Sequence, residues 1–234
     1  MEFDGLLSGV LERRYKRFLA DVTLADGATV TAHCPNTGAM TGLAEPGLRV
    51  WLSESDNPAR KLRWTLELVE TDQGIACVHS ALANKVVGEA LERQRIAPLR
   101  GDWEIRPEVR IPGSARVDFV LSRGEERVIV EVKAVTLLGE RGAGLFPDAR
   151  SERAQKHAEA LAASVLPNTR AVLLYCVFHS GIQRVSPAAE IDPAYAAAVR
   201  KAVDEGVEVI ACSCAISPQS IEVIGMLPVE GLAE

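Results

Sequence analysis

The chain has 234 residues, of which 47% are hydrophobic and 25% are charged, and its formal net charge at pH 7 is -6. This composition is that of a folded globular protein and excludes a collagen-like or largely disordered chain. The acidic balance argues against a general attraction to phosphate backbones, so nucleic-acid binding would have to depend on local basic residues. The five cysteines, an odd number, and the absence of a secretory or membrane-spanning pattern lead us to expect a cytoplasmic protein that does not bind membranes.

Residues 1–80 have the pattern of a small β-barrel domain. From residue 13 onwards, short apolar segments alternate with Gly, Asn and Asp turn signals, and the helical repeat is nearly absent. Five or so short strands of this kind are typical of small barrels, and the oligonucleotide-binding (OB) barrel is one candidate among several. The expected strands are 17–24, 29–34, 49–55, 63–71 and 75–80.

Residues 81–234 have the pattern of a second, α/β domain. Strands and helices alternate late in this part, which predicts parallel strands added to a sheet that begins as an antiparallel hairpin. The glycine-rich stretch 137–149 predicts an irregular, flexible loop beside a site, with a plain surface connection as the alternative. The periodicity predicts helices over 81–96, 151–166 and 193–206, and strands over 103–111, 115–122, 127–137, 169–178 and 207–216.

The segment RVIVEVKA, residues 127–134, has the composition of a buried strand but carries an acid and a base. Because side chains alternate along a strand, Glu131 and Lys133 share one face. If Gly124 and Glu125 form a two-residue turn, the hairpin register places Asp118 directly opposite Glu131. A loop of three to five residues would change this register.

Two facing carboxylates in a half-buried sheet repel each other unless a positive group lies between them. Mg²⁺, for which Mn²⁺ is a substitute, takes carboxylate oxygens and completes its shell with waters and substrate phosphates. Lys133 could then orient a water that attacks a phosphorus atom. The alternative is an ion pair of Lys133 with Asp118 or Glu131 without any metal, since E-x-K alone is a weak pattern.

An Asp in one strand followed, after a short turn, by E-x-K in the next resembles the core of the PD-(D/E)XK nucleases. With this motif, further segments resemble the sugar fermentation stimulation protein A family, in order along most of the chain. The resemblance implies an OB-like barrel followed by a nuclease-like, mixed-sheet α/β domain. It also implies DNA binding and a role in regulating sugar metabolism, particularly that of maltose. The segments are ERRYKRFLADV, CPNTGAM, SARVDFVL, VEVKAVTL, FPDARSERAQKH and EIDPAYA.

The resemblance also implies roles for single residues. The metal-binding acids of the nuclease motif fall on Asp118 and Glu131, and its catalytic lysine falls on Lys133. An additional glutamate, which the first helix sometimes supplies, corresponds to Glu89 as a further metal ligand. A glutamine that some relatives of this core carry on the following helix corresponds to Gln155 as a second catalytic residue.

Two segments of the predicted barrel are candidates for contact with nucleic acid. In HCPNTGAM, Asn36 and Thr37 could bind a phosphate together with backbone N–H groups, although a turn held by local hydrogen bonds is the alternative. In ERRYKRF, basic residues beside aromatic ones could bind phosphates while a ring stacks on a base, although a solvated barrel surface is equally compatible. The basic residues are Arg13, Arg14, Lys16 and Arg17.

Two functions fit these patterns. The first is a DNA-binding protein in which both domains form the binding surface and which regulates sugar metabolism. The second is a Mg²⁺-dependent nuclease that hydrolyses phosphodiester bonds of DNA or RNA. The intact set of Asp118, Glu131 and Lys133 favours retained chemistry, because a protein that only binds has no need of both carboxylates.

Overall fold

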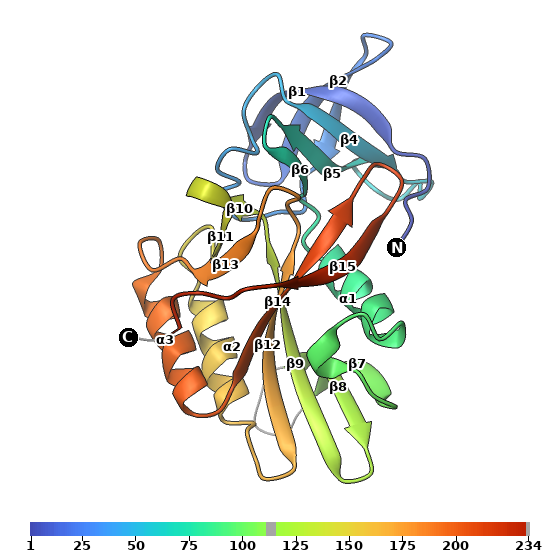
Figure 1. Cartoon of the computed structure of the whole chain (residues 1–234). Helices are drawn as coiled ribbons and strands as arrows, with labels where there is room; N and C mark the ends of the chain where they lie inside the picture. The colour runs from blue at the N-terminus through green and yellow to red at the C-terminus, as the bar shows by residue number, and fades with distance from the viewer. Residues whose placement is uncertain (111–115, 233–234) are drawn as a thin grey trace.

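The computed structural model describes residues 1–110 and 116–232 of the chain. Its N-terminal part is a small β-barrel, drawn in blue to teal in Figure 1. The strand order is β3-β2-β1-β4-β5-β6, and a parallel pairing of β3 with β5 closes the barrel. This confirms the OB-like barrel. The strands are β1 (Leu7–Tyr15), β2 (Leu19–Leu24), β3 (Thr29–His33), β4 (Arg49–Glu54), β5 (Trp64–Thr71) and β6 (Gly74–Cys77).

The barrel interior is filled by the apolar side chains that alternate with polar ones along each strand. Leu11, Val22 and Leu66, from three different strands, are buried there. The expected first strand, 17–24, was wrong in its start, because the chain turns at residues 16–18 and a whole strand, β1, precedes the turn. Lys16 and Arg17 have φ angles of 49° and 64°, which end the extended backbone that simple alternation through RRYKRF assumed.

The second part of the chain is built on a six-stranded mixed sheet, as expected. The strand order is β15-β14-β12-β9-β8-β7, in which β9, β12 and β14 run parallel and the other pairs are antiparallel. The hairpin of β8 and β9 begins the parallel part. The strands are β7 (Glu104–Arg110), β8 (Arg116–Arg123), β9 (Glu126–Val135), β12 (Thr169–Val177), β14 (Glu208–Ile216) and β15 (Ile221–Leu227).

Helices cover both faces of this sheet (Figure 1). Helix α1 (Leu82–Glu92) packs on the face that also contacts the barrel, so that barrel residues such as Trp51 share a core with it. Helices α2 (Glu152–Ala162) and α3 (Pro193–Asp204) pack on the opposite face. The side chains of Ser151 and Asp192 cap the N-termini of α2 and α3 by accepting backbone N–H bonds.

The glycine-rich stretch 137–149, expected as an irregular loop, contains two short strands. Strand β10 (Leu137–Leu138) pairs with β11 (Ala143–Phe146), which pairs in parallel with β13 (Arg184–Pro187). Because β13 lies far along the chain, local composition could not predict this small sheet. Two short 3-10 helices, η1 (Ala97–Leu99) and η2 (Glu140–Gly142), complete the elements. Within the described residues, no helix is both long and apolar enough to span a lipid bilayer.

Candidate functional site

The hairpin register that sequence predicted is present. Gly124, with a φ of 60°, and Glu125 form the turn, and Arg123 pairs with Glu126 at the start of the ladder. The ladder of β8 with β9 ends at Phe119 and Val130, although both strands continue. Its next step would pair Asp118 with Glu131. The two strands therefore separate at the point where these two carboxylates face each other.

Where the backbone ladder of β8 and β9 has ended, the side-chain carboxylate of Asp118 links the two strands. Its Oδ2 accepts a hydrogen bond of 2.7 Å from the backbone N–H of Val132, and its Oδ1 accepts one of 2.7 Å from the side-chain amide of Asn84 on α1. Burial and the nearby charge of Glu131 nevertheless raise the pKa of Asp118 above its ordinary value. The two hydrogen bonds and the charge of Lys133 lower this pKa, but they do not outweigh burial and the charge of Glu131.

Glu131 is buried, and its partners are cationic or can become so. Lys133 Nζ donates to Glu131 Oε1 at 2.6 Å, and Nδ1 of His157 on α2 makes a short contact with the same oxygen. Burial alone would raise the pKa of Glu131, but the hydrogen bond to His157 and the charge of Lys133 hold it below its ordinary value. Lys133 Nζ also lies 3.3 Å from His157 Nδ1, so the three side chains form one cluster.

The carboxylate oxygens of this cluster can bind a hard divalent cation, but the cluster contains only two carboxylates. Each oxygen of Asp118 accepts one hydrogen bond and retains a second lone pair, and the two contacts to Glu131 use Oε1 and not Oε2. In residues 1–110 and 116–232, no three or more His, Cys, Asp and Glu side chains are arranged to hold a metal ion. Two carboxylates are sufficient for Mg²⁺, which characteristically keeps several waters and takes its remaining ligands from a substrate.

The structure does not bring Glu89 to this cluster. The Glu89 carboxylate forms an ion pair of 2.7 Å with the amino group of Met1, and Arg93 lies 3.9 Å from it. These contacts keep the pKa of Glu89 low. Residue 89 follows Asn84 by five positions, and five helical steps of 100° turn it away from the face that meets Asp118. Asn84 is the residue of α1 that contacts the carboxylate cluster.

Gln155 also lies apart from the cluster. Its Nε2 donates to Asp192 Oδ1 at 3.1 Å, and the same carboxylate accepts the backbone N–H groups of Ser151 and Tyr195. Gln155 therefore ties α2 to the start of α3. His157, two residues later on α2, is the side chain that reaches Glu131.

The predicted phosphate-binding arginines of the barrel have different surroundings. Arg13 is exposed, pairs with Asp21 at 2.8 Å and lies over the ring of Tyr15. Arg14 is half-buried and donates to the backbone carbonyls of Arg17, Asn36 and Gly38, at 2.9 to 3.0 Å. Arg14 thus holds two loops together, a role that sequence alone did not suggest.

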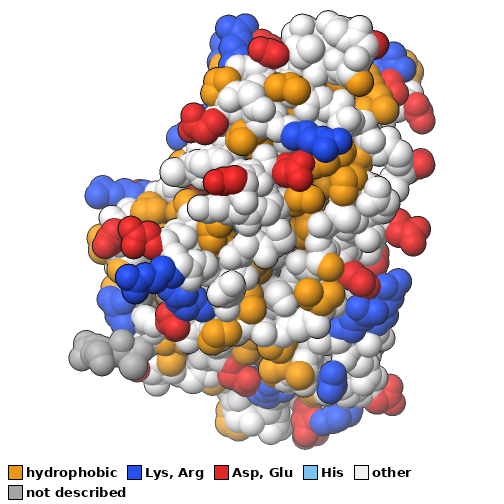
Figure 2. Space-filling view, turned by 45° about the horizontal axis from the view of Figure 1, so that its top comes forward, with side chains coloured by type: hydrophobic (Ala, Val, Ile, Leu, Met, Phe, Trp, Pro, Cys, Tyr) orange, Lys and Arg blue, Asp and Glu red, His pale blue; other side chains and the backbone are white. Residues whose placement is uncertain are grey.

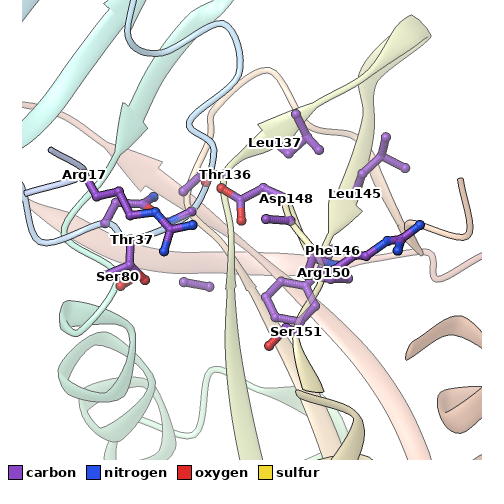
Figure 3. A pocket seen from close by; sticks show the side chains of 15 residues that line it. Arg17, Thr37, Ser80, Thr136, Leu137, Leu145, Phe146, Asp148, Arg150 and Ser151 are labelled. Carbon is purple, nitrogen blue, oxygen red and sulfur yellow. The ribbon is translucent and has the colours of Figure 1, made fainter. Parts of the chain in front are cut away.

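Three of the four remaining barrel candidates lie at a cleft between the barrel and the second domain (Figure 3). Arg17, Asn36 and Thr37 line this cleft, whose volume is about 310 Å³. Asn36 is buried and its Oδ1 accepts the N–H of Gly38, which is the local turn foreseen as the alternative to phosphate binding, whereas Thr37 is exposed. Lys16 is exposed on the β1–β2 turn and is not among the lining residues.

Two residues of the site were not assigned from sequence. Asn84 stands in an ordinary amphipathic helix, and no spacing marks it as a partner of Asp118. His157 stands beside Lys156 in a charged helix, and no spacing marks it as a partner of Glu131. The helical spacing of the buried Ala154 and Ala158 shows which face of α2 meets the sheet, and His157 lies next to that face.

Comparisons with known proteins agree with this architecture. Residues 13–78 match the family model described as the SfsA N-terminal OB domain, and residues 81–220 match the one described as the sugar fermentation stimulation protein RE domain. Two relatives called sugar fermentation stimulation protein homolog are similar over nearly their whole length. The one from Pseudoalteromonas atlantica is 54% identical, covering 97% of each chain, and the one from Nitrosococcus oceani is 47% identical, covering 98% of this chain and 99% of its own.

A solved structure is similar in fold over the same extent. It is described as the structure of Pyrococcus furiosus SfsA in complex with Ca²⁺, and it has a TM-score of 0.87 and 26% identity, covering 98% of both chains. The two matched models together span both parts of the chain, and the relatives match nearly its whole length. On this evidence, the chain belongs to the sugar fermentation stimulation protein family.

Proposed function

We propose that this chain binds nucleic acid, DNA foremost, and hydrolyses its phosphodiester bonds in a Mg²⁺-dependent reaction at Asp118, Glu131 and Lys133. The observation that carries the proposal is the meeting of two carboxylates where β8 and β9 separate, with Lys133 on the same face. The ion named for the Pyrococcus furiosus relative, Ca²⁺, prefers the same oxygen ligands as Mg²⁺, which supports a divalent site here.

Each side chain has a role that follows from its contacts. Asp118 and Glu131 would hold the cation, and Asn84 keeps the Asp118 carboxylate in one orientation through its 2.7 Å hydrogen bond. A bound divalent cation would neutralise charge on the scissile phosphate. The Lys133 ammonium uses one donor on Glu131 and has two others, with which it can hold an attacking water or a phosphate oxygen. His157 keeps Glu131 and Lys133 in register from α2.

A second function, DNA binding without turnover and a part in regulating sugar metabolism, is favoured by a different observation. Lys133 and Glu131 form an ion pair of 2.6 Å. Their charges therefore neutralise each other without any metal cation. The names of the relatives refer to sugar fermentation and to no cleavage reaction. In this function the barrel and the second domain would bind DNA together, and the cluster would be a structural ion pair.

The experiment that separates the two functions measures binding and cleavage on the same substrates. Purified protein is incubated with single- and double-stranded DNA and RNA in Mg²⁺, Mn²⁺ or EDTA. We expect cleavage only with a metal, and a loss of at least about a hundredfold in Lys133→Ala, because that variant lacks the donor at the reacting phosphate. The matched control is Lys156→Ala, which removes an exposed lysine of α2 and should cleave like the wild type.

The outcomes are distinct for each function. Cleavage that survives in Lys133→Ala would contradict the assigned site and point to a contaminating nuclease. Binding without cleavage of any substrate in either metal would refute the hydrolytic function and leave DNA binding as the function. Absence of both binding and cleavage would refute both.

A further inference from the structure

The cleft between the barrel and the second domain has the chemistry of a nucleotide site. One end carries a cation and hydroxyl groups, with Arg17, Thr37 and Ser80 among its lining residues (Figure 3). The other end carries the ring of Phe146, beyond which lies Arg150. A cation with hydroxyl donors suits a phosphate, and an aromatic ring suits a base, so the two ends match the two parts of a nucleotide.

The two arginines of the cleft differ from the other basic residues nearby. Arg13 is paired with Asp21, and the Arg14 guanidinium donates to four backbone carbonyls. In the described part of the chain, the guanidinium groups of Arg17 and Arg150 donate no hydrogen bond and form no ion pair, and both residues are exposed. Their donors are therefore available to a ligand.

The position of Arg17 is held by the backbone at some cost. Lys16 and Arg17 are consecutive residues with left-handed φ angles of 49° and 64°, a conformation that is unfavourable for side chains with a Cβ. The Arg17 carbonyl accepts from Arg14 at 3.0 Å, and this contact fixes the turn against the Asn36 loop. Strained backbone of this kind is found preferentially where a side chain has to be held for function.

The one acid of the cleft is already occupied. Asp148 accepts the backbone N–H of Met40 at 3.3 Å, and its carboxylate lies against Gly38, so that it joins the second domain to the barrel. The ring of Phe146 makes a tilted contact with Tyr175, at 5.9 Å between ring centroids, and an edge contact with Tyr195, at 5.3 Å. One wall of the cleft is therefore formed by the well-packed ring of Phe146. With two arginines and one aspartate among its lining residues, the cleft carries a net positive charge.

Three segments of the chain that line the cleft also lead to the carboxylate cluster. Ala134, which lines it, follows Lys133 on β9. Ser80 lies one helical turn before Asn84, the partner of Asp118, and Ser151 caps the helix that carries His157. Three segments that line the cleft therefore also carry residues of the cluster or their hydrogen-bond partners.

The size of the cleft restricts the ligand. Its volume of about 310 Å³ is at the lower end of the range for small-ligand sites, which suits one nucleotide unit and not a duplex. On the face shown in Figure 2, acidic and basic side chains are interspersed and no broad basic area is present. With a net charge of -6, local contacts of this kind have to supply the attraction.

We propose that this cleft binds the terminal nucleotide of a single-stranded nucleic acid, with a phosphate at Arg17, the base against Phe146 and a second phosphate contact at Arg150. The proposal rests on the proposed function and adds its substrate class: single strands, or the frayed end of a duplex, are the substrates that can reach the cluster.

The test measures binding in EDTA, so that turnover plays no part. Fluorescence anisotropy is recorded for a labelled single-stranded oligonucleotide and for the matching blunt duplex. We expect the single strand to bind more tightly and Arg17→Ala to weaken it about tenfold, with a fall of about 1 in the slope of log K against log salt. Arg49→Ala, which removes an exposed arginine of the same barrel that is paired with Glu70, is the matched control and should bind like the wild type.

Arg150→Ala is the second variant, because Arg150 lies outside the strained turn and its replacement leaves that turn intact. We expect Arg150→Ala also to bind the single strand more weakly than the wild type does. Thymidine monophosphate is added as a competitor: displacement of the strand from the wild type, with less effect on Arg17→Ala, supports a site that a free nucleotide can fill. If thymidine monophosphate does not displace the strand but both variants bind the strand more weakly, the cleft binds a nucleotide only as part of a strand.

Equal binding of single strand and blunt duplex would overturn the proposal, as would wild-type affinity in both Arg17→Ala and Arg150→Ala. These results are independent of the hydrolytic function. If the variants lose binding while the wild type cleaves nothing in Mg²⁺ or Mn²⁺, the cleft is a binding site and the nuclease proposal fails. If cleavage requires Lys133 but neither arginine matters for binding, the hydrolytic function stands and the cleft proposal fails.

Discussion

Asp192 offers the sharpest test of how the second domain is held together. Its side chain is buried, and its two oxygens accept the backbone N–H groups at the starts of both helices that cover one face of the sheet. Oδ2 accepts from Ser151 at 2.9 Å and Oδ1 accepts from Tyr195 at 3.0 Å, while the Gln155 amide donates to Oδ1 at 3.1 Å. We consider Asp192→Asn, which preserves shape but replaces one oxygen by an NH₂ group.

The expected loss of stability follows from the two backbone N–H groups that donate to Asp192. In the variant, the Tyr195 N–H can still donate to the remaining side-chain oxygen. The Ser151 N–H, however, faces the new NH₂ group and has no acceptor. One charge-assisted hydrogen bond of about 1.5–3 kcal/mol is therefore lost. We therefore expect the free energy of unfolding at pH 7 to fall by about 2–3 kcal/mol. For a chain of this size, that corresponds to a decrease in melting temperature of about 4–12 °C.

The pH dependence gives a second, independent check. Burial by itself raises the pKa of Asp192, but the N–H groups of Ser151 and Tyr195 and the Gln155 amide outweigh it and hold the pKa below its ordinary value. A carboxyl group with a lowered folded-state pKa contributes its full stability above its unfolded pKa of about 3.9 and loses it as the pH falls through the folded value. The gap between wild type and Asp192→Asn should therefore be constant from pH 7 to about 5 and narrow below about 4.

Urea unfolding at pH 7 and thermal unfolding between pH 7 and pH 3 measure these quantities. Glu190→Gln, which replaces an exposed acid in the same segment, is the control and should change stability by less than about 0.5 kcal/mol. Wild-type stability of Asp192→Asn at pH 7 would refute the reasoning. A gap that does not narrow in acid would show that shape, and not the charge of the carboxylate, holds the two helices.

Three further variants test other contacts. Asn84→Ala removes the 2.7 Å hydrogen bond to Asp118 and should weaken Mn²⁺ binding about 10–100-fold in titration calorimetry; unchanged affinity would mean that Asn84 serves only the fold. Gly38→Ala introduces a Cβ that overlaps the Asp148 carboxylate and should cost about 1–3 kcal/mol in urea unfolding, and less in an Asp148→Ala background; strictly additive losses would contradict the contact. Tyr195→Phe removes one hydroxyl of a buried pair 2.8 Å apart and should cost about 1 kcal/mol by the same assay; no loss would mean that the pair contributes nothing net.

The sequence predicted the elements whose signals are local. Every strand of the mixed sheet except the last one, β15, was expected within a few residues, because apolar alternation and turn residues mark strands directly. The helices were expected to run longer than they do. Helix α1 ends at Glu92, and Gln94 adopts a left-handed φ of 54°, a backbone reversal that the apolar periodicity of the segment does not mark.

The elements that sequence did not predict depend on distant partners. Strands β10, β11 and β13 are short and form a sheet only because a distant segment, β13, returns to pair in parallel with β11. The assignments of Glu89 and Gln155 came from resemblance, and the structure gives both side chains other partners, the Met1 amino group and Asp192. A residue type at a roughly suitable position does not determine which way its helix is turned.

The sequence by itself determined the hairpin, and with it the facing of Asp118 and Glu131 and the position of Lys133, because a two-residue turn sets register and alternation sets the face. Only the tertiary structure decided which side chains complete the cluster and the cleft. Asn84 meets Asp118 across 34 residues, and His157 meets Glu131 across 26. Such contacts depend on how helices rotate and pack against the sheet, and that is set by the whole core at once and not by any segment alone.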